Sequence, residues 1–271
     1  MKRSDWDRRI RRAEELAAMH PFAAEVLQFY IDVAGLQQML YLYFEEACGK
    51  AQRNKEPGSL LLDSSLDLLL PKFRQSLADL ETVASQPIAA AAHELTFQPA
   101  EQLQYLLTSC WENISDHQPG LGKTKALLAW LFLQPYAENL ADHSEHTLSS
   151  SASAHCPFCS GKPVVGVLRP EGDGAKRFLT CSMCSTEWAY RRIVCPACGE
   201  ETVEKLGIYT ASQFSHVRVE ACDTCGRYIK TVDLTKNGRA VPIVDELATI
   251  PLNFWAYEHG YVKLQTNLLG I

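Results

Sequence analysis

The cysteines in the second half of the chain constrain its fold more than any other feature. Eight of the ten cysteines form four C-x-x-C pairs. The pairs are Cys156/Cys159, Cys181/Cys184, Cys195/Cys198 and Cys222/Cys225. Two cysteines three positions apart on a tight turn can direct both sulfurs at one ion, while amides of the turn hydrogen-bond to them. Each pair is therefore predicted to supply two ligands to a metal ion.

The spacing between the pairs predicts how they combine. The gap is 21 residues between the first two pairs and 23 between the last two, which is close to the spacing typical of zinc ribbons. Two cysteine turns brought together by a hairpin close a tetrahedron of four sulfurs. Site one is expected to consist of Cys156, Cys159, Cys181 and Cys184, and site two of Cys195, Cys198, Cys222 and Cys225. The ten residues from 185 to 194 then bridge two ribbons.

The two predicted ribbons resemble one another in sequence. The first and third pairs begin 39 residues apart, and the second and fourth begin 41 apart. CPFCSG matches CPACGE, and KRFLTCSMC has the same polar and apolar alternation as HVRVEACDTC. This pattern predicts one unit that was duplicated with a two-residue insertion.

The expected compartment narrows the chemistry of the thiols. The opening MKRSDWDRRIRRAEE lacks the apolar run of a signal peptide, and no stretch of about 18 apolar residues follows. We therefore expect a cytoplasmic protein without membrane insertion, in which disulfides are disfavoured. A thioredoxin-type dithiol would need one C-x-x-C in a βαβ setting, and paired turns at ribbon spacing favour a single ion over an iron–sulfur cluster.

The identity of the ions and their role stay open at this point. Four thiolates in a tetrahedron suit zinc and iron alike, so the expected cofactors are two mononuclear ions, iron or zinc. Both structural and redox roles are compatible with such sites. A ribbon of about 40 residues has little core of its own, and a bound metal contributes on the order of 10 kcal/mol to folding.

The pattern of apolar residues predicts the fold class. Residues 5 to about 140 show helical periodicity and predict five to seven helices packed as a bundle. Short alternating stretches beyond residue 155 predict strands. The expected class is α+β, an N-terminal all-α helical domain followed by two small rubredoxin-like or zinc-ribbon β modules. The expected divisions are a helical domain (1–140), a linker (141–155), two ribbons (156–193 and 194–240), and a C-terminal helix and tail (241–271).

The distribution of charge argues against a nucleic-acid partner. Residues 156–271 carry 13 Lys and Arg against 12 Asp and Glu, and four thiolates around a divalent ion add a net charge of −2 at each site. Ribbons that bind nucleic acid instead carry an excess of basic residues that neutralise phosphates.

Other motifs have simpler structural interpretations. The run RRIRRAEE (8–15) predicts a solvated helix face with i,i+3 and i,i+4 ion pairs. Gly122, Lys123 and Thr124 match the end of a phosphate-binding loop, but the first glycine of that motif is missing, so they predict the start of a helix. Cys48 and Cys110 are expected to be small buried apolar side chains. No catalytic or cofactor-binding constellation is recognisable, which predicts a protein that is not an enzyme.

Several segments resemble the formate dehydrogenase accessory protein family, FdhE. The resemblance lies in CSMCSTEWAYRRIVCPACG (181–199), HVRVEACDTCGRYIKTVDL (216–234) and VDELATIPLNFWAYEHGYVKL (244–264), and extends to RRAEELAAMHPFAAEVLQFY (11–30). Generic zinc ribbons share the cysteines of these segments but not the residues around them. Two departures are Asn253, where the family often has Asp, and Ser160, which separates Cys159 from Gly161.

The resemblance implies a non-enzymatic function. It implies a cytoplasmic accessory factor, or chaperone, that binds the catalytic subunit of respiratory formate dehydrogenase during its maturation. It also implies rubredoxin-like ribbons in which the eight paired cysteines hold iron. Two alternatives from other classes are a zinc-ribbon nucleic-acid-binding protein and a rubredoxin-like electron carrier. Self-association stays open.

Overall fold

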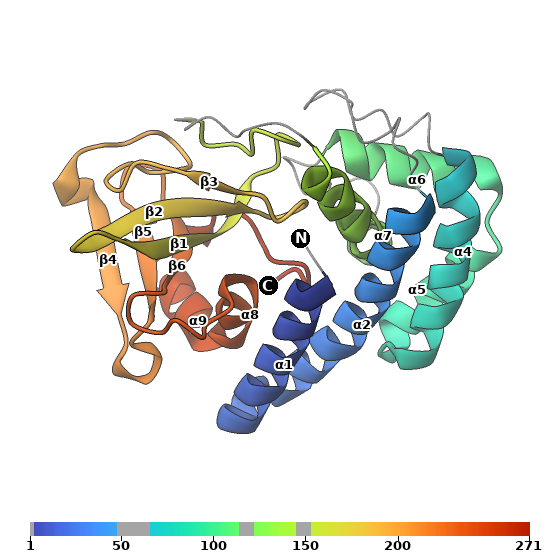
Figure 1. Ribbon diagram of the computed structural model, residues 1–271, viewed down its shortest axis with the longest axis horizontal. Coiled ribbons are helices and arrows are strands. Elements are labelled where there is room, and N and C mark those ends of the chain that lie inside the picture. The colour runs from blue at the N-terminus through green and yellow to red at the C-terminus, as the bar shows by residue number, and fades with distance from the viewer. Residues whose placement is uncertain (1–2, 48–65, 114–121, 145–152) are drawn as a thin grey trace.

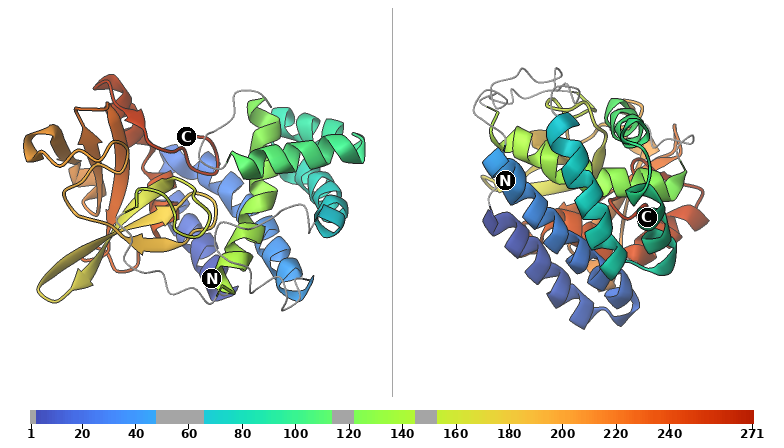
Figure 2. Two further views of the ribbon diagram at one scale, coloured as in Figure 1. Left: turned by 90° about the horizontal axis from the view of Figure 1, so that it is seen from above. Right: turned by 90° about the vertical axis from the view of Figure 1, so that its right-hand side faces the viewer.

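The computed structural model describes residues 3–47, 66–113, 122–144 and 153–271. The predictions for Cys48 and for most of the linker fall outside these ranges. Helices occupy one end of the molecule and a β-sheet the other, with α1 and α8 where the two meet (Figure 1). Seen from above, α1 and α2 lie between the sheet and the helices α4, α5 and α6 (Figure 2). The α+β class predicted from the sequence is confirmed.

The helical region follows the predicted periodicity. Its helices are α1 (Arg3–Met19), α2 (Ala24–Ala47), α4 (Leu66–Val83), α5 (Gln86–Thr96), α6 (Ala100–Glu112) and α7 (Lys123–Asp142). A short 3-10 turn, Pro21–Ala23, starts the second of these helices because proline fits the first helical turn. The helix α7 is buried on all sides from Leu128 to Leu140, which is typical of a helix at the centre of a bundle.

The strands form one sheet rather than two separate ribbons. The strands are β1 (Pro163–Glu171), β2 (Gly174–Cys181), β3 (Glu187–Ala189), β4 (Leu206–Thr210), β5 (Val217–Cys222), β6 (Arg227–Asp233) and β7 (Val262–Lys263). Within the described residues the sheet order is β3-β2-β1-β6-β5-β4, and β7 pairs with β6. Each half of this order is an antiparallel three-stranded unit, and the parallel pairing of β1 with β6 joins the halves.

The registers of the two units agree with the predicted duplication. In the first unit, Gly166–Leu168 of β1 pair with Arg177–Leu179 of β2. In the second unit, Ile208–Thr210 of β4 pair with Arg218–Glu220 of β5, which lie 41 residues beyond their counterparts in β2. The strand β4 is thus the structural equivalent of β1.

Two short helices and a continuous core connect the sheet to the helical region. Where one C-terminal helix was predicted, the chain forms α8 (Pro242–Ala248) and α9 (Ile250–Glu258), which break at Thr249 just before Ile250-Pro251. Pro251 fits the first turn of α9, whereas inside one continuous helix it would lack the N–H that bonds to the preceding turn. Helix α8 packs against α1 and against the sheet, and one apolar cluster extends from α1, α2 and α7 to the cysteines of site one. None of the helices in the described ranges combines the length and apolarity needed to cross a bilayer.

Candidate metal centres

Site one brings together the four cysteines predicted for it. Cys156 and Cys159 precede β1, Cys181 ends β2, and Cys184 lies on the turn that follows. The Sγ atoms are 3.5 Å apart between Cys156 and Cys184, 3.4 Å between Cys159 and Cys181, and 3.5 Å between Cys159 and Cys184. All four residues are at most 9% exposed. The β1–β2 hairpin thus closes a buried set of four sulfurs.

Site two repeats this arrangement nearer to the surface. Its Sγ atoms are 3.8 Å apart between Cys195 and Cys225, and 3.7 Å apart between Cys198 and Cys222. Here the β4–β5 hairpin connects the two cysteine turns. Cys198 is exposed and Cys225 is half-buried, whereas the other two cysteines are buried. Site two is therefore the more accessible of the two.

The backbone of the cysteine turns explains why their sulfurs converge. The residue after the second cysteine has a positive φ in all four turns, at Ser160 (62°), Ser185 (54°), Gly199 (78°) and Gly226 (66°). Glycine adopts this conformation without strain, whereas serine does so at a cost of about 1 kcal/mol. Amides also donate to sulfur at 3.4 Å, from Phe158 to Cys156, from Met183 to Cys181 and from Ala197 to Cys195.

Both sets of sulfurs fit one tetrahedral ion. A metal–sulfur distance of about 2.3 Å gives sulfur–sulfur edges of about 3.8 Å in a tetrahedron, close to the 3.7 and 3.8 Å of site two and slightly longer than the edges of site one. The ligand atoms of each set all lie within 4.8 Å of one another. Burial raises the pKa of the Cys181, Cys184 and Cys195 thiols. An ion that binds there must therefore displace protons, so its affinity rises with pH.

Polar side chains of α7 fix site one to the helical region. Gln134 donates to the carbonyl of Ser182 at 3.1 Å. One turn further along the helix, Glu138 is fully buried and accepts hydrogen bonds from Ser185 at 2.5 Å and from Arg9 at 3.1 Å. Ser185 thus keeps its positive φ while its hydroxyl bridges helix and turn. The second cysteine turn of site one is docked directly on α7.

Arg177 determines how the two sites lie relative to one another. This β2 side chain is 2% exposed and forms an ion pair with Glu220 of β5 at 2.6 Å. It also donates to the carbonyls of Arg191 and Val194 in the bridge, at 3.0 and 3.1 Å. One guanidinium therefore connects the first unit, the second unit and the segment between them.

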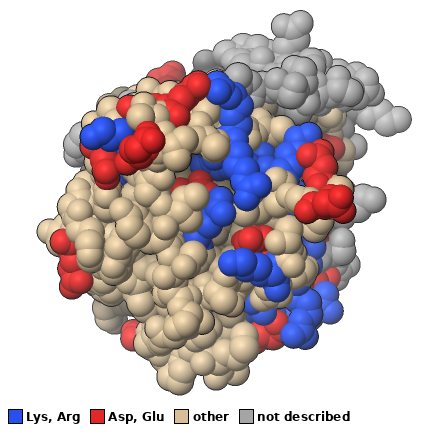
Figure 3. Space-filling model, turned by 90° about the vertical axis from the view of Figure 1, so that its left-hand side faces the viewer, with Lys and Arg blue, Asp and Glu red and all other residues tan. Residues whose placement is uncertain are grey.

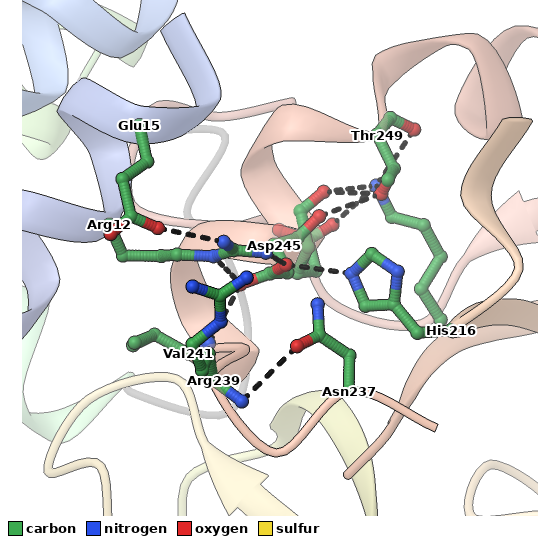
Figure 4. A network of polar contacts seen from close by, with 10 residues as sticks. Arg12, Glu15, His216, Asn237, Arg239, Val241, Asp245 and Thr249 are labelled. Atoms are coloured by element: carbon green, nitrogen blue, oxygen red, sulfur yellow. Dashed lines mark hydrogen bonds and ion pairs between the residues drawn. The ribbon is translucent and has the colours of Figure 1, made fainter. Parts of the chain in front are cut away.

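A second polar network connects the N-terminal helix to the C-terminal region. Asp245 of α8 lies between Arg12 of α1, at 2.6 Å, and His216, at 2.8 Å (Figure 4). It also accepts the amide of Val241 at 2.7 Å. Burial raises the pKa of Asp245, but hydrogen bonds from His216 and Arg12 outweigh that effect, so the pKa lies below its ordinary value.

Glu246, the next residue, is the centre of a third network. Its carboxylate is fully buried with Lys230 at 2.9 Å and Lys263 at 2.5 Å, and it accepts from Asn267 at 2.9 Å. Burial raises the pKa of Glu246, but the two lysines outweigh this and bring it to about 2. This network holds α8 against β6 and the C-terminal segment.

The structure corrects one sequence prediction and agrees with two others. The run RRIRRAEE was predicted to be a solvated face with local ion pairs. Arg12 does pair with Glu15, three residues on, at 3.0 Å, but Arg9 and Arg12 are only 5% and 6% exposed, since they also pair with carboxylates of distant helices. Cys110 is buried, as predicted. Gly122 precedes the first turn of α7 with a φ of 74°, in agreement with the predicted helix start.

Comparisons with known proteins agree with the resemblance found in the sequence. The family description "FdhE, central domain" matches residues 155–192, and "FdhE, C-terminal domain" matches residues 179–269. The curated protein named "Protein FdhE homolog" of Aquifex aeolicus is 36% identical over 141 residues, which is 51% of this chain and 50% of that protein. The chain thus matches half the length of that relative.

Other relatives match nearly the whole chain. The "Protein FdhE homolog" of Cronobacter sakazakii is 26% identical over 97% of this chain and 86% of its own. The "Protein FdhE homolog" of Haemophilus ducreyi is 24% identical over 97% of this chain and 88% of its own. The crystal structure of the FdhE protein from Pseudomonas aeruginosa has the same fold, with a TM-score of 0.72, 24% identity, and coverage of 99% of this chain and 96% of that one.

Proposed function

The chain belongs to the FdhE family, and from that premise we propose that it is a non-enzymatic accessory factor for formate dehydrogenase. It binds the catalytic subunit of that enzyme in the cytoplasm during maturation. The family names support an accessory protein of formate dehydrogenase. The choice of the catalytic subunit is the more specific part of the proposal.

The eight paired cysteines hold the metal in this proposal. Site one binds one ion through Cys156, Cys159, Cys181 and Cys184, and site two binds another through Cys195, Cys198, Cys222 and Cys225. Each ion is iron or zinc, since the all-sulfur tetrahedral donor set suits both. The divisions proposed for the chain are 1–140, 141–155, 156–193, 194–240 and 241–271, as expected from the sequence.

The observation that carries the proposal is the pair of closed four-sulfur sets. A metal with four protein ligands has no open position for a substrate, and such closed sites are typical of structural metals. Site one lies at the junction of α7 and the sheet, so an ion there would stabilise the relative placement of the two regions. This arrangement suits a rigid binding surface better than a catalyst.

A deletion experiment tests the proposed function. Loss of the gene should lower formate-linked respiration while the transcript of the dehydrogenase stays unchanged, and the wild-type gene should restore activity. A variant with Cys181→Ser should restore much less. Full formate dehydrogenase activity in the deletion strain would refute the proposed function.

The exposure of site two supports one alternative, a rubredoxin-like electron carrier. Cys198 is exposed, so electrons could reach an iron ion at site two from a partner at the surface. Such a protein would be red when purified without oxygen, and its colour would disappear and return as it is reduced and reoxidised. A colourless protein that contains only zinc would exclude this alternative.

A further inference from the structure

The strand β4 leaves one end of the sheet open. It has no neighbouring strand on its outer side among the described residues. Open edges present unpaired N–H and C=O groups, and proteins usually protect them with charged residues, proline or a covering loop. The sequence of β4 is LGIYT, and its last three residues, Ile208, Tyr209 and Thr210, are exposed. The edge is therefore uncharged and accessible.

The internal repeat indicates what this edge can bind. In the first unit, the equivalent edge of β1 is occupied, because Gly166–Leu168 pair in parallel with Thr231–Asp233 of β6. The corresponding segment of β4 is Ile208–Thr210, as the registers with β2 and β5 show. The same chain thus contains one unit whose edge accepts a parallel strand and a second unit whose equivalent edge is open.

A cavity adjoins the open edge on one face of the sheet. It has a volume of about 150 Å³ and lies between β4, the bridge and site two. Its apolar lining includes Ile193, Val194, Val203, Leu206 and Ile208. Three of these side chains are more than half exposed, Ile193 at 53%, Val203 at 61% and Ile208 at 59%. An apolar cavity of about this size holds a group as large as benzene.

Two arginines at the cavity can bind an acidic group of a ligand. Cys195 and Cys222 of site two line the cavity together with four charged residues, of which Arg177 and Glu220 are paired with each other. Arg192 and Arg227 are exposed, and no carboxylate among the described residues pairs with either. On this side of the molecule a wide uncharged area borders a band of basic side chains (Figure 3). Arg227 donates to the carbonyl of Lys263 at 3.4 Å, and neither guanidinium group is neutralised by a carboxylate of the described residues, so both can pair with a carboxylate next to an apolar side chain.

We propose that β4 and the adjoining cavity bind an extended segment of the formate dehydrogenase catalytic subunit as an added parallel strand. Main-chain hydrogen bonds to β4 supply affinity, and a side-chain pocket supplies specificity, as in other cases of strand addition. The segment places an apolar side chain in the cavity and a neighbouring carboxylate near Arg192 and Arg227. The identity of the partner rests on the proposed function, whereas the chemistry of the segment rests on the edge and the cavity.

Hydrogen exchange of the full, zinc-loaded chain tests strand addition directly. Exchange is measured by mass spectrometry with and without the purified catalytic subunit. The amides of residues 206–210 that face away from β5 should exchange at least tenfold more slowly in the complex, since strand pairing protects them. A complex that forms while these amides exchange at an unchanged rate would overturn the inference and leave the proposed function intact.

Matched variants test the side-chain part of the inference. Ile208→Lys places a charge at the exposed edge, and Met39→Lys makes the same change at a 60% exposed position on α2. Ile208→Lys should weaken binding at least about tenfold, corresponding to about 1.4 kcal/mol, whereas Met39→Lys should bind as wild type does. The double variant Arg192→Glu/Arg227→Glu should weaken binding and reduce its dependence on salt. Equal affinities for all variants would refute the inference.

The binding of the wild-type chain separates the two proposals. If the wild type does not bind the catalytic subunit at all, the proposed function fails and the inference fails with it. If the wild type binds and the edge variants bind equally well, only the inference fails. Zinc content and circular dichroism of each variant establish that it is folded, and the exchange experiment on the wild type needs no variant.

Discussion

Replacement of Arg12 by Met should destabilise the junction between the N-terminal helix and the C-terminal region. The change keeps the length of the side chain but removes the partner of Asp245, whose carboxylate is 0% exposed. Breaking a buried ion pair by removing one partner costs about 3–5 kcal/mol. Asp245 keeps His216 and the amide of Val241, so we expect the lower end of this range, about 3 kcal/mol.

This cost should be visible in thermal unfolding at a fixed free zinc concentration. For a chain of this size, about 3 kcal/mol lowers the Tm by about 6–12 °C. Arg11→Met is the matched control, because Arg11 is an exposed residue of the same helix and should change stability by no more than about 0.5 kcal/mol. The double variant Arg12→Met/Asp245→Asn removes the unpaired charge and should regain at least half of the loss. A Tm for Arg12→Met equal to that of the control would refute the reasoning.

Three further predictions concern the cysteine turns and the buried acids. Ser185→Gly removes the hydroxyl that bridges to α7, so it should lower the free energy of unfolding measured in urea by about 1–2 kcal/mol, although glycine adopts the positive φ without strain. Ser160→Gly should not lower it. Glu246 contributes stability that is fully present above about pH 4.5 and is lost as the pH falls toward 2, so Glu246→Gln should flatten the dependence of the urea midpoint on pH in this range. Cys181→Ser should lower the Tm more than Cys198→Ser, because only the first lies in the core shared with the helices; equal losses would contradict this.

The cysteine turns were predictable because their signal is local. A C-x-x-C turn carries both ligands and the residue of positive φ within five positions, and the gaps of 21 and 23 residues between the pairs indicate which turns combine. The structure accordingly places all eight cysteines in the two expected groups. That these groups hold metal ions stays a prediction.

The networks that hold the regions together could not be predicted from local patterns. Arg12 and Asp245 are 233 positions apart, and Arg9 and Glu138 are 129 apart. Nothing near RRIRRAEE distinguishes the buried arginines from the exposed ones, because the burying surface comes from α7 and α8. The periodicity of apolar residues predicts which side of a helix is buried, whereas the element that packs against that side depends on the tertiary fold.

The parallel joining of the two ribbons has no signal in the sequence either. The parallel pairing of β1 with β6 involves three residues on each strand, too few to leave a signature. The segment LGIYT of β4 contains a glycine, which weakens most strands. In this strand the ring of Tyr209 lies over Gly207, where an added Cβ would be only 2.6 Å from its hydroxyl oxygen. The ring of Tyr209 thus packs over Gly207, which has no side chain of its own.

The most direct test of the central claim is the metal content of the protein purified without oxygen, combined with its visible spectrum. We predict two ions of iron or zinc per chain and no acid-labile sulfide. Cys195→Ala/Cys198→Ala should lose one ion and keep the other, because the two sites share no ligand. Less than one ion per wild-type chain, or an unchanged metal content in the variant, would contradict the assignment of these eight cysteines to two metal centres.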